Sequence, residues 1–129
     1  MSLEKFLEKV KDSEKVIALD FDGVIHNDNK GFHDGTIYGS PIKGTKRALN
    51  LLSKKYKLVI YSCKSNPQRP LIGGKNGIEL IWGWLLKWDL KQYISYVASN
   101  KPNALMYIDD KGLKFNNWTQ TLNIINKLK

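Results

Sequence analysis

Four aspartates occupy two places in the sequence where an apolar run ends. Asp20 and Asp22 are one residue apart, and Asp109 and Asp110 are adjacent. Carboxylates at the end of a buried strand are costly unless something offsets their charge. A divalent cation does so, and hard oxygen ligands suit Mg²⁺. Each pair alone is more typical of a turn or a helix cap, but two pairs in matching positions favour a magnesium site.

A hydroxyl group and an ammonium group stand in comparable positions. Ser62 follows the apolar run 58–61, and Lys101 lies in the loop before the apolar run 104–108. One lysine does not offset four carboxylates, but together with a bound Mg²⁺ and one hydroxyl it makes a site for a phosphoryl group. These residues therefore predict phosphoryl chemistry, provided that the fold brings them together.

The elements that must bring them together are predicted from the apolar patterns. Continuous apolar runs predict buried parallel strands, and stripes spaced by three and four residues predict helices. Strands are expected over residues 16–21, 57–62, 93–98 and 104–108, and helices over residues 3–10, 45–55, 77–88 and 118–128. Asn76 and Asn117 are the expected caps of the last two helices.

The alternation of strands and helices predicts the fold class. It favours an α/β fold, a three-layer Rossmann-like parallel sheet with helices on both faces, in a single domain over residues 1–129. The carboxyl ends of parallel strands meet at one edge of the sheet, where ligands bind. The acidic pairs and Ser62 are therefore expected to converge.

Two segments between these elements are irregular. Residues 26–40 are polar and rich in glycine, and residues 36–38 favour a short strand, so a small flap hairpin is predicted. The loop 65–74 has too many prolines and glycines for regular structure. His26 is expected to be a solvated turn residue, and Cys63 a small buried residue.

These residues resemble the sequence motifs of the haloacid dehalogenase superfamily. Residues 20–24 (Asp-Phe-Asp-Gly-Val) are similar to its first motif, Asp-x-Asp-x-(Thr/Val), and Ser62 resembles the second motif. Lys101 resembles the lysine of the third motif, and residues 107–110 (Tyr-Ile-Asp-Asp) resemble the acidic fourth motif. The four motifs occur in the family's order, and the first is the most specific.

The resemblance implies a role for each catalytic candidate. Asp20 is the expected nucleophile, which attacks phosphorus in line and forms an aspartyl-phosphate. Asp22 is the expected general acid for the leaving oxygen and then the base that activates water. Ser62 is expected to bind a phosphoryl oxygen by a hydrogen bond. Lys101 is expected to neutralise charge on the nucleophile and the phosphoryl group.

The resemblance also implies a metal site and an open domain. The carboxylates of Asp20 and Asp109 and the backbone carbonyl of Asp22 are expected to hold Mg²⁺, and Asp110 to support it directly or through water. Members of the family often carry a cap domain, but the segments between the motifs are too short for one here. The chain is therefore expected to be a capless, phosphatase-like member, and similar capless enzymes act on macromolecular substrates or use a partner as the lid.

Basic residues are concentrated in residues 43–75. This segment holds nine lysines and arginines and no acidic residue, and it accounts for the whole net charge of +9. Such a segment either steers anionic partners or forms a solvated helix face. Lys64 and Arg69 are candidates for binding the non-reacting part of an anionic substrate, although surface loop charges are an equally good interpretation. The expected substrate is a phosphorylated small molecule, a nucleotide or a nucleic-acid end.

Composition limits the remaining classes. The chain of 129 residues has one cysteine, which excludes an intrachain disulfide, and no apolar run that could span a membrane. We expect a soluble cytoplasmic protein without a membrane partner. The leading hypothesis is a Mg²⁺-dependent phosphomonoester hydrolase. The alternatives are a metal- and phosphate-binding module with little turnover, and a basic nucleic-acid-binding protein with a vestigial acidic site.

Overall fold

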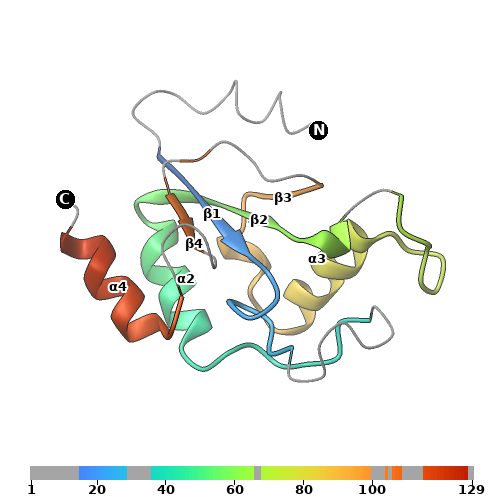
Figure 1. Cartoon of the computed structure of the whole chain (residues 1–129), viewed down its shortest axis with the longest axis horizontal. Coiled ribbons are helices and arrows are strands. Elements are labelled where there is room, and N and C mark those ends of the chain that lie inside the picture. Colours follow the sequence, from blue (N-terminus) through green and yellow to red (C-terminus); the bar gives the residue numbers. More distant parts are fainter. Residues whose placement is uncertain are drawn as a thin grey trace.

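The computed structural model describes residues 15–28, 36–65, 68–99, 104, 106–108 and 115–127. Within these ranges four parallel strands form one sheet in the order β3-β2-β1-β4 (Figure 1). The strands are β1 (Lys15–Asp20), β2 (Tyr56–Tyr61), β3 (Tyr96–Ala98) and β4 (Met106–Ile108). The parallel α/β sheet expected from the apolar runs is therefore confirmed.

The α-helices of the described residues are α2 (Thr45–Ser53), α3 (Gly77–Lys87) and α4 (Trp118–Lys127). The Asn76 side chain accepts a hydrogen bond from the Glu79 N–H at 2.8 Å, and the Glu79 side chain accepts one from the Asn76 N–H at 3.1 Å. The expected capping box therefore starts α3. Asn117 caps α4 by accepting from the Gln120 N–H at 2.8 Å. None of the helices in the described ranges is long and apolar enough to cross a membrane.

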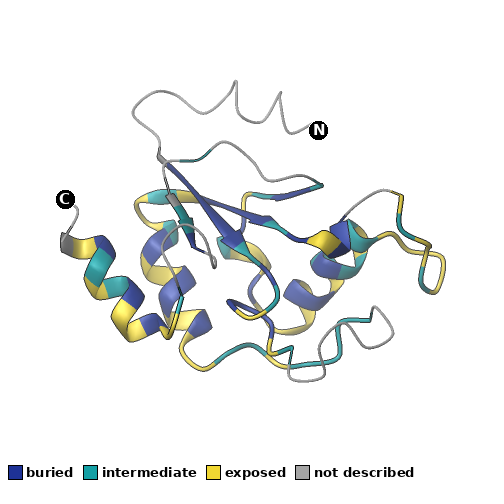
Figure 2. Ribbon diagram, in the orientation of Figure 1, coloured by how far each residue is buried: buried dark blue, intermediate teal, exposed yellow. Residues whose placement is uncertain are grey.

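Alternate residues of each strand lie on opposite faces of the sheet. Ile17 and Leu19 belong to a large buried cluster with apolar residues of α2, α3 and α4. Figure 2 shows that buried residues, in dark blue, occur along the strands and on these helices. Val16 and Val59 belong to a smaller cluster on the other face. The helices of the described residues therefore cover one face. Residues 1–14, which contain a further expected helix, lie outside the described part of the chain.

The third strand is shorter than expected. It begins at Tyr96 and not at residue 93. The residues before it form a 3₁₀ helix, η2 (Lys91–Tyr93), whose turn the apolar pattern alone does not distinguish from a strand. The strand still pairs with β2 in parallel, so its place in the sheet is unaffected.

The flap is paired at its base. The Asn27 N–H donates to the Ser40 carbonyl oxygen at 2.9 Å, and the Ile42 N–H donates to the Ile25 carbonyl oxygen at 2.8 Å. The short strand expected at residues 36–38 is absent. The tip of the flap lies outside the described residues. The hairpin prediction is thus correct for the two paired segments at the base of the flap.

Candidate active site

The chain makes a tight turn directly after β1, at the carboxyl edge of the sheet. Gly23 has a φ of +80°, a left-handed conformation that glycine adopts without steric cost. The Phe21 carbonyl oxygen accepts hydrogen bonds from the N–H groups of Ile25 at 3.0 Å and His26 at 2.9 Å. This tight turn brings the His26 side chain against Asp22.

Both carboxylate oxygens of Asp22 have buried partners. Oδ1 accepts a hydrogen bond from Nδ1 of His26 at 2.8 Å, and Oδ2 accepts one from Nζ of Lys64 at 2.6 Å. The His26 side chain is fully buried and that of Lys64 is 4% exposed, whereas that of Asp22 is 19% exposed.

The pKa of Asp22 lies below its ordinary value. Burial by itself raises this pKa, but the hydrogen bonds from His26 and Lys64, together with the positive charge of Lys64, outweigh the effect of burial. Asp22 is therefore ionised at neutral pH in the free protein.

The hydrogen bonds of His26 determine its tautomer. Its Nε2 accepts a hydrogen bond from the Gly39 N–H at 2.9 Å, so Nε2 carries no proton and Nδ1 is the donor to Asp22. The ring stacks on Phe21 with 5.3 Å between centroids and meets Trp84 edge-on at 5.7 Å. The solvated position expected for His26 is therefore wrong. A buried neutral imidazole connects the flap to Asp22.

Ser62 lies at the same edge of the sheet as Asp20. Asp20 is the last residue of β1 and pairs with Tyr61, the last residue of β2, so Ser62 is one residue beyond that level. Ser62 is 8% exposed, and its Oγ accepts a hydrogen bond from the Lys64 N–H at 3.1 Å. The structure therefore brings the candidate nucleophile and the candidate phosphate-binding hydroxyl to one edge, as the strand pattern predicts.

The chain after Ser62 leaves the sheet in a 3₁₀ helix, η1 (Cys63–Ser65). The Ser65 hydroxyl lies 2.6 Å from the carbonyl oxygens of both Ser62 and Ala98, which joins the ends of β2 and β3. Cys63 is exposed. Its expected buried position is wrong, because the alternation of strand residues stops at Tyr61.

The two candidate substrate-binding residues line one small cavity. Lys64 and Arg69 lie around it together with Ile37 of the flap and Leu80 of α3. Lys64 is not a solvated loop charge, because its ammonium group is buried against Asp22. Arg69 is partly buried beside it, and its contact with substrate stays a prediction.

Three predicted site residues, Lys101, Asp109 and Asp110, lie outside the described residues. β4 reaches the relevant edge of the sheet at Ile108, which pairs with Leu19 of β1. Within the described part of the chain, no group of three or more His, Cys, Asp or Glu side chains is placed to hold a metal ion. The predicted magnesium site therefore stays a prediction.

The partners of Asp22 carry no motif of their own. His26 lies four residues after Asp22, and Lys64 two residues after Ser62, so their one sequence signal is proximity to the first two motifs. Comparisons with protein-family models, with curated proteins and with solved structures found no match for this chain.

Proposed function

We propose that this protein is a Mg²⁺-dependent phosphatase that hydrolyses phosphomonoesters through an aspartyl-phosphate on Asp20. The supporting observation is the carboxylate of Asp22, two residues after Asp20, which is held by a buried imidazole and a buried ammonium group. A turn or a helix cap needs no such pair of partners. A group that transfers protons to and from a substrate needs a fixed position. The proposal includes a capless domain of the haloacid dehalogenase type with helices on both faces of the sheet.

The proposed reaction has two displacements at phosphorus. Asp20 attacks phosphorus in line, and the bond from phosphorus to the leaving oxygen breaks. A phosphoester dianion beside Asp22 raises its pKa, which favours the protonated form that gives its proton to the leaving oxygen. Asp22 then takes a proton from a water molecule, which attacks the aspartyl-phosphate at phosphorus. Inorganic phosphate leaves, and Asp20 is restored.

Two further residues stabilise charge in this proposal. The Ser62 hydroxyl donates a hydrogen bond to a phosphoryl oxygen, since Ser62 follows the residue that pairs with Asp20 and lies at the same edge of the sheet. Lys101 offsets negative charge on the nucleophile and the phosphoryl group. Both act by electrostatic stabilisation, which usually contributes most to phosphoryl transfer.

The residues present fit a magnesium ion. The Asp20 carboxylate and the Asp22 backbone carbonyl are hard oxygen donors. Both carboxylate oxygens of Asp22 already accept hydrogen bonds from side chains, which leaves its carbonyl as the group for the metal. In the proposal Asp109 completes the ligand set and Asp110 supports it. A bound ion stabilises negative charge on the phosphoryl oxygens.

Hydrolysis of p-nitrophenyl phosphate tests this function. The wild-type protein should release p-nitrophenol with Mg²⁺, lose this activity in EDTA and recover it when Mg²⁺ is restored. Asp20→Asn should lower turnover by about 10³-fold or more, because the nucleophile is removed, while its circular dichroism spectrum stays unchanged. Turnover by Asp20→Asn, or turnover insensitive to EDTA, would count against the proposal.

The proposed substrates are nucleotides or phosphorylated nucleic-acid ends. Arg69 beside the site and the basic segment support an anionic substrate larger than phosphate. A screen of phosphorylated metabolites and of oligonucleotides with 3′- or 5′-phosphates identifies the class. Binding of Mg²⁺ and phosphate without turnover would instead indicate a binding module. Salt-dependent oligonucleotide binding that is unchanged in Asp20→Asn would indicate a nucleic-acid-binding protein.

A further inference from the structure

We propose that His26 and Lys64 are positioning residues for Asp22, and that Gly39 and Gly77 hold these two side chains in place. The inference rests on the proposed role of Asp22 in proton transfer. It assigns a purpose to four residues that no motif marks, and it makes the flap and the start of α3 part of the catalytic machinery.

His26 is the first of the two positioning residues. Its ring donates to one oxygen of Asp22 at 2.8 Å and accepts from the Gly39 N–H at 2.9 Å. Phe21 and Trp84 pack on the ring, which is fully buried. Because each ring nitrogen has one partner, the imidazole cannot rotate without losing both hydrogen bonds.

Gly39 sets the distance between the flap and the ring. A Cβ on this residue would overlap the carbonyl oxygen of Asn27 and lie 2.9 Å from Nε2 of His26. Any other residue would therefore push the flap away from His26. The Trp84 indole N–H also donates to the Gly39 carbonyl oxygen at 2.8 Å, which fixes the same residue from the side of α3.

Lys64 is the second positioning residue. Its ammonium group donates to the other oxygen of Asp22 at 2.6 Å, and its backbone N–H donates to Ser62 Oγ at 3.1 Å. A Cβ on Gly77, the first residue of α3, would overlap the Lys64 carbonyl group. The start of α3 therefore packs directly against the backbone of Lys64. This contact fixes the position from which the Lys64 side chain reaches Asp22.

Stability alone gives a weak reason for this arrangement. Taking the charge of a lysine out of water is costly, and well-packed apolar residues often replace a buried ion pair without loss of stability. The arrangement does hold both oxygens of one carboxylate, each by a different buried side chain. A displacement of about 1 Å in a catalytic group lowers a rate by about 10²-fold, so a fixed carboxylate is a catalytic advantage.

The test compares two substitutions of His26 in the full-length protein. The amide of His26→Gln offers an NH₂ group as donor and a carbonyl oxygen as acceptor, and His26→Phe offers neither. With p-nitrophenyl phosphate and Mg²⁺, His26→Phe should lower kcat by about 10²-fold with KM changed by less than about 3-fold, and His26→Gln should restore at least about a tenth of the wild-type kcat. Equal kcat values for folded His26→Phe and wild type overturn the inference.

Glycine substitutions test the supports with a matched control. Gly39→Ala and Gly77→Ala should lower kcat by about 10-fold or more, since each displaces one partner of Asp22. Gly83→Ala is the same chemical change in the middle of α3, where a Cβ meets nothing within 4 Å, and it should leave kcat unchanged. Similar kcat values in all three variants overturn the role given to Gly39 and Gly77.

A second readout needs neither turnover nor a variant. A long-range proton–nitrogen NMR spectrum of the wild-type histidine rings should show His26 as the neutral tautomer with the proton on Nδ1. The other tautomer overturns the inference whatever the activity. A wild-type protein with this tautomer but without turnover overturns the proposed phosphatase function. The positioning of Asp22 by His26 and Lys64 then has no catalytic purpose. An active wild type with unaffected His26 variants overturns the positioning role alone.

Discussion

Gly23 allows Asp22 to meet its partners. Its φ of +80° turns the chain directly after Asp22, and its N–H donates to the His26 carbonyl oxygen at 2.9 Å. A Cβ at Gly23 would have room, because the nearest atom outside its chain neighbours is Oδ1 of Asp28 at 3.8 Å. The backbone conformation, and not a lack of space, therefore requires glycine at this position.

We expect Gly23→Ala to lower the free energy of unfolding by about 1–2 kcal/mol, the usual penalty for an L side chain in a left-handed conformation. Urea denaturation followed by circular dichroism measures the change. Gly83→Ala is the control, and it should raise the free energy of unfolding by about 0.5–1 kcal/mol, because it lies in a helix with open space around it. A similar loss of stability in both variants would contradict the conformational explanation.

Some residues of the site were predictable from sequence and others were not. The meeting of Asp20, Asp22 and Ser62 at one edge was predictable, because each follows an apolar run that forms a parallel strand. The burial of His26 and Lys64 was not, because it depends on Trp84 and on the start of α3, which lie far away in the sequence. Apolar periodicity reports on the element that contains a residue and carries no information about which distant side chains will cover it.

At the scale of elements, α3 has defined signals at both of its ends. At the C-terminal end the Asp89 N–H donates to the Leu86 carbonyl oxygen at 3.2 Å, and the Leu90 N–H donates to that of Leu85 at 2.8 Å. These are the two hydrogen bonds of a Schellman motif, with Asp89 in the left-handed conformation at a φ of 58°. Lys46 of α2 donates to the Asp89 carboxylate at 2.6 Å, which connects the two helices.

The Lys46–Asp89 ion pair gives a prediction with a defined sign. The hydrogen bond from Lys46, and then its charge, lower the pKa of Asp89 below the ordinary 3.8, and the hydrogen bond to Asp89 is the main reason that the pKa of Lys46 lies above 10.5. A lowered carboxyl pKa stabilises the folded protein above the ordinary value, and this stabilisation is lost as the pH falls through the folded value. A raised lysine pKa stabilises it up to the ordinary value, and this is lost as the pH rises through the folded value.

We therefore expect Asp89→Asn to melt below the wild type by no more than about 3 °C at neutral pH, since the pair is exposed. Asparagine also tolerates the left-handed conformation, so the substitution removes the charge and leaves the backbone unchanged. The difference should vanish at acid pH well below 3.8 and in about 1 M NaCl. Melting curves by circular dichroism measure it, and a difference that persists at acid pH and high salt would exclude the ion pair as its cause.

The elements themselves followed from the sequence more closely than their packing did. Asn76 and Asn117 cap helices where they were expected to, because the bonds of a cap are local. The strand expected at 36–38 does not form, since three residues with strand-forming side chains need a neighbour to pair with. Helices were expected on both faces of the sheet, and the face opposite α2, α3 and α4 is covered by no helix of the described ranges.

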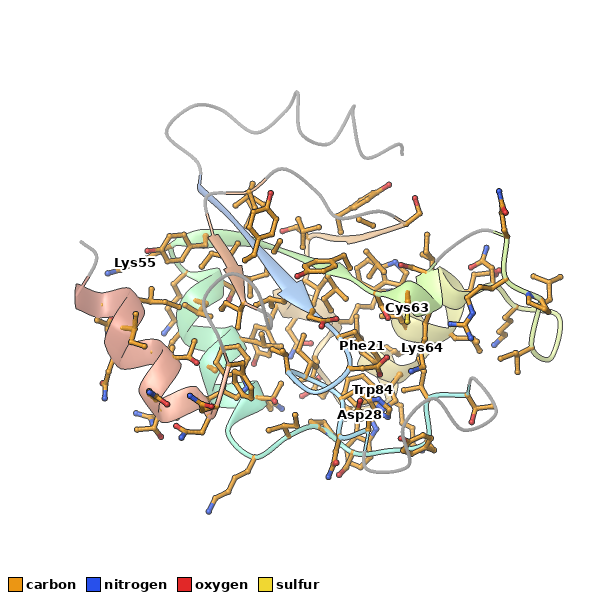
Figure 3. All side chains as sticks on the ribbon, viewed as in Figure 1. Phe21, Asp28, Lys55, Cys63, Lys64 and Trp84 are labelled. Atoms are coloured by element: carbon orange, nitrogen blue, oxygen red, sulfur yellow. The ribbon has the colours of Figure 1, made fainter. Side chains whose placement is uncertain are left out.

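At the scale of the whole molecule, the basic segment 43–75 is divided between two places. Arg69 lines the cavity beside Lys64 at the candidate site. Arg47 and Lys55 instead line a groove of about 390 Å³ between α2 and α4. Lys55 lies far from Lys64 (Figure 3). A segment that is continuous in sequence therefore has a part that faces the site and a part that does not.

Two charge-reversal substitutions distinguish a direct contact between Arg69 and the substrate from attraction by the net charge of the protein. Arg69→Glu should raise KM for a phosphorylated nucleotide by about 10-fold, the loss of one charge-assisted contact of about 1.4 kcal/mol. Lys55→Glu changes the net charge by the same amount but lies in the separate groove between α2 and α4, so screening by salt should keep the change in KM below about 2-fold at physiological salt. Equal increases in both variants would show that the total charge, and not a contact of Arg69, attracts the substrate.

The arrangement of the whole sheet was predictable only in part. The alternation of strands and helices predicts parallel strands whose carboxyl ends share an edge, and the pairings bear this out. The order β3-β2-β1-β4, with β1 inside the sheet, depends on how the connecting helices cross over the strands. The strand order therefore depends on packing between distant segments. The spacing of apolar residues in the sequence gives no information about that packing.

The exposed thiol of Cys63 has a practical consequence. It directly follows Ser62, and the chain has no second cysteine. A maleimide dye or a spin label would therefore attach at one known position beside the carboxyl edge of the sheet, without any engineered substitution. The emission or mobility of that label would report when a molecule occupies this edge, even for compounds that undergo no reaction.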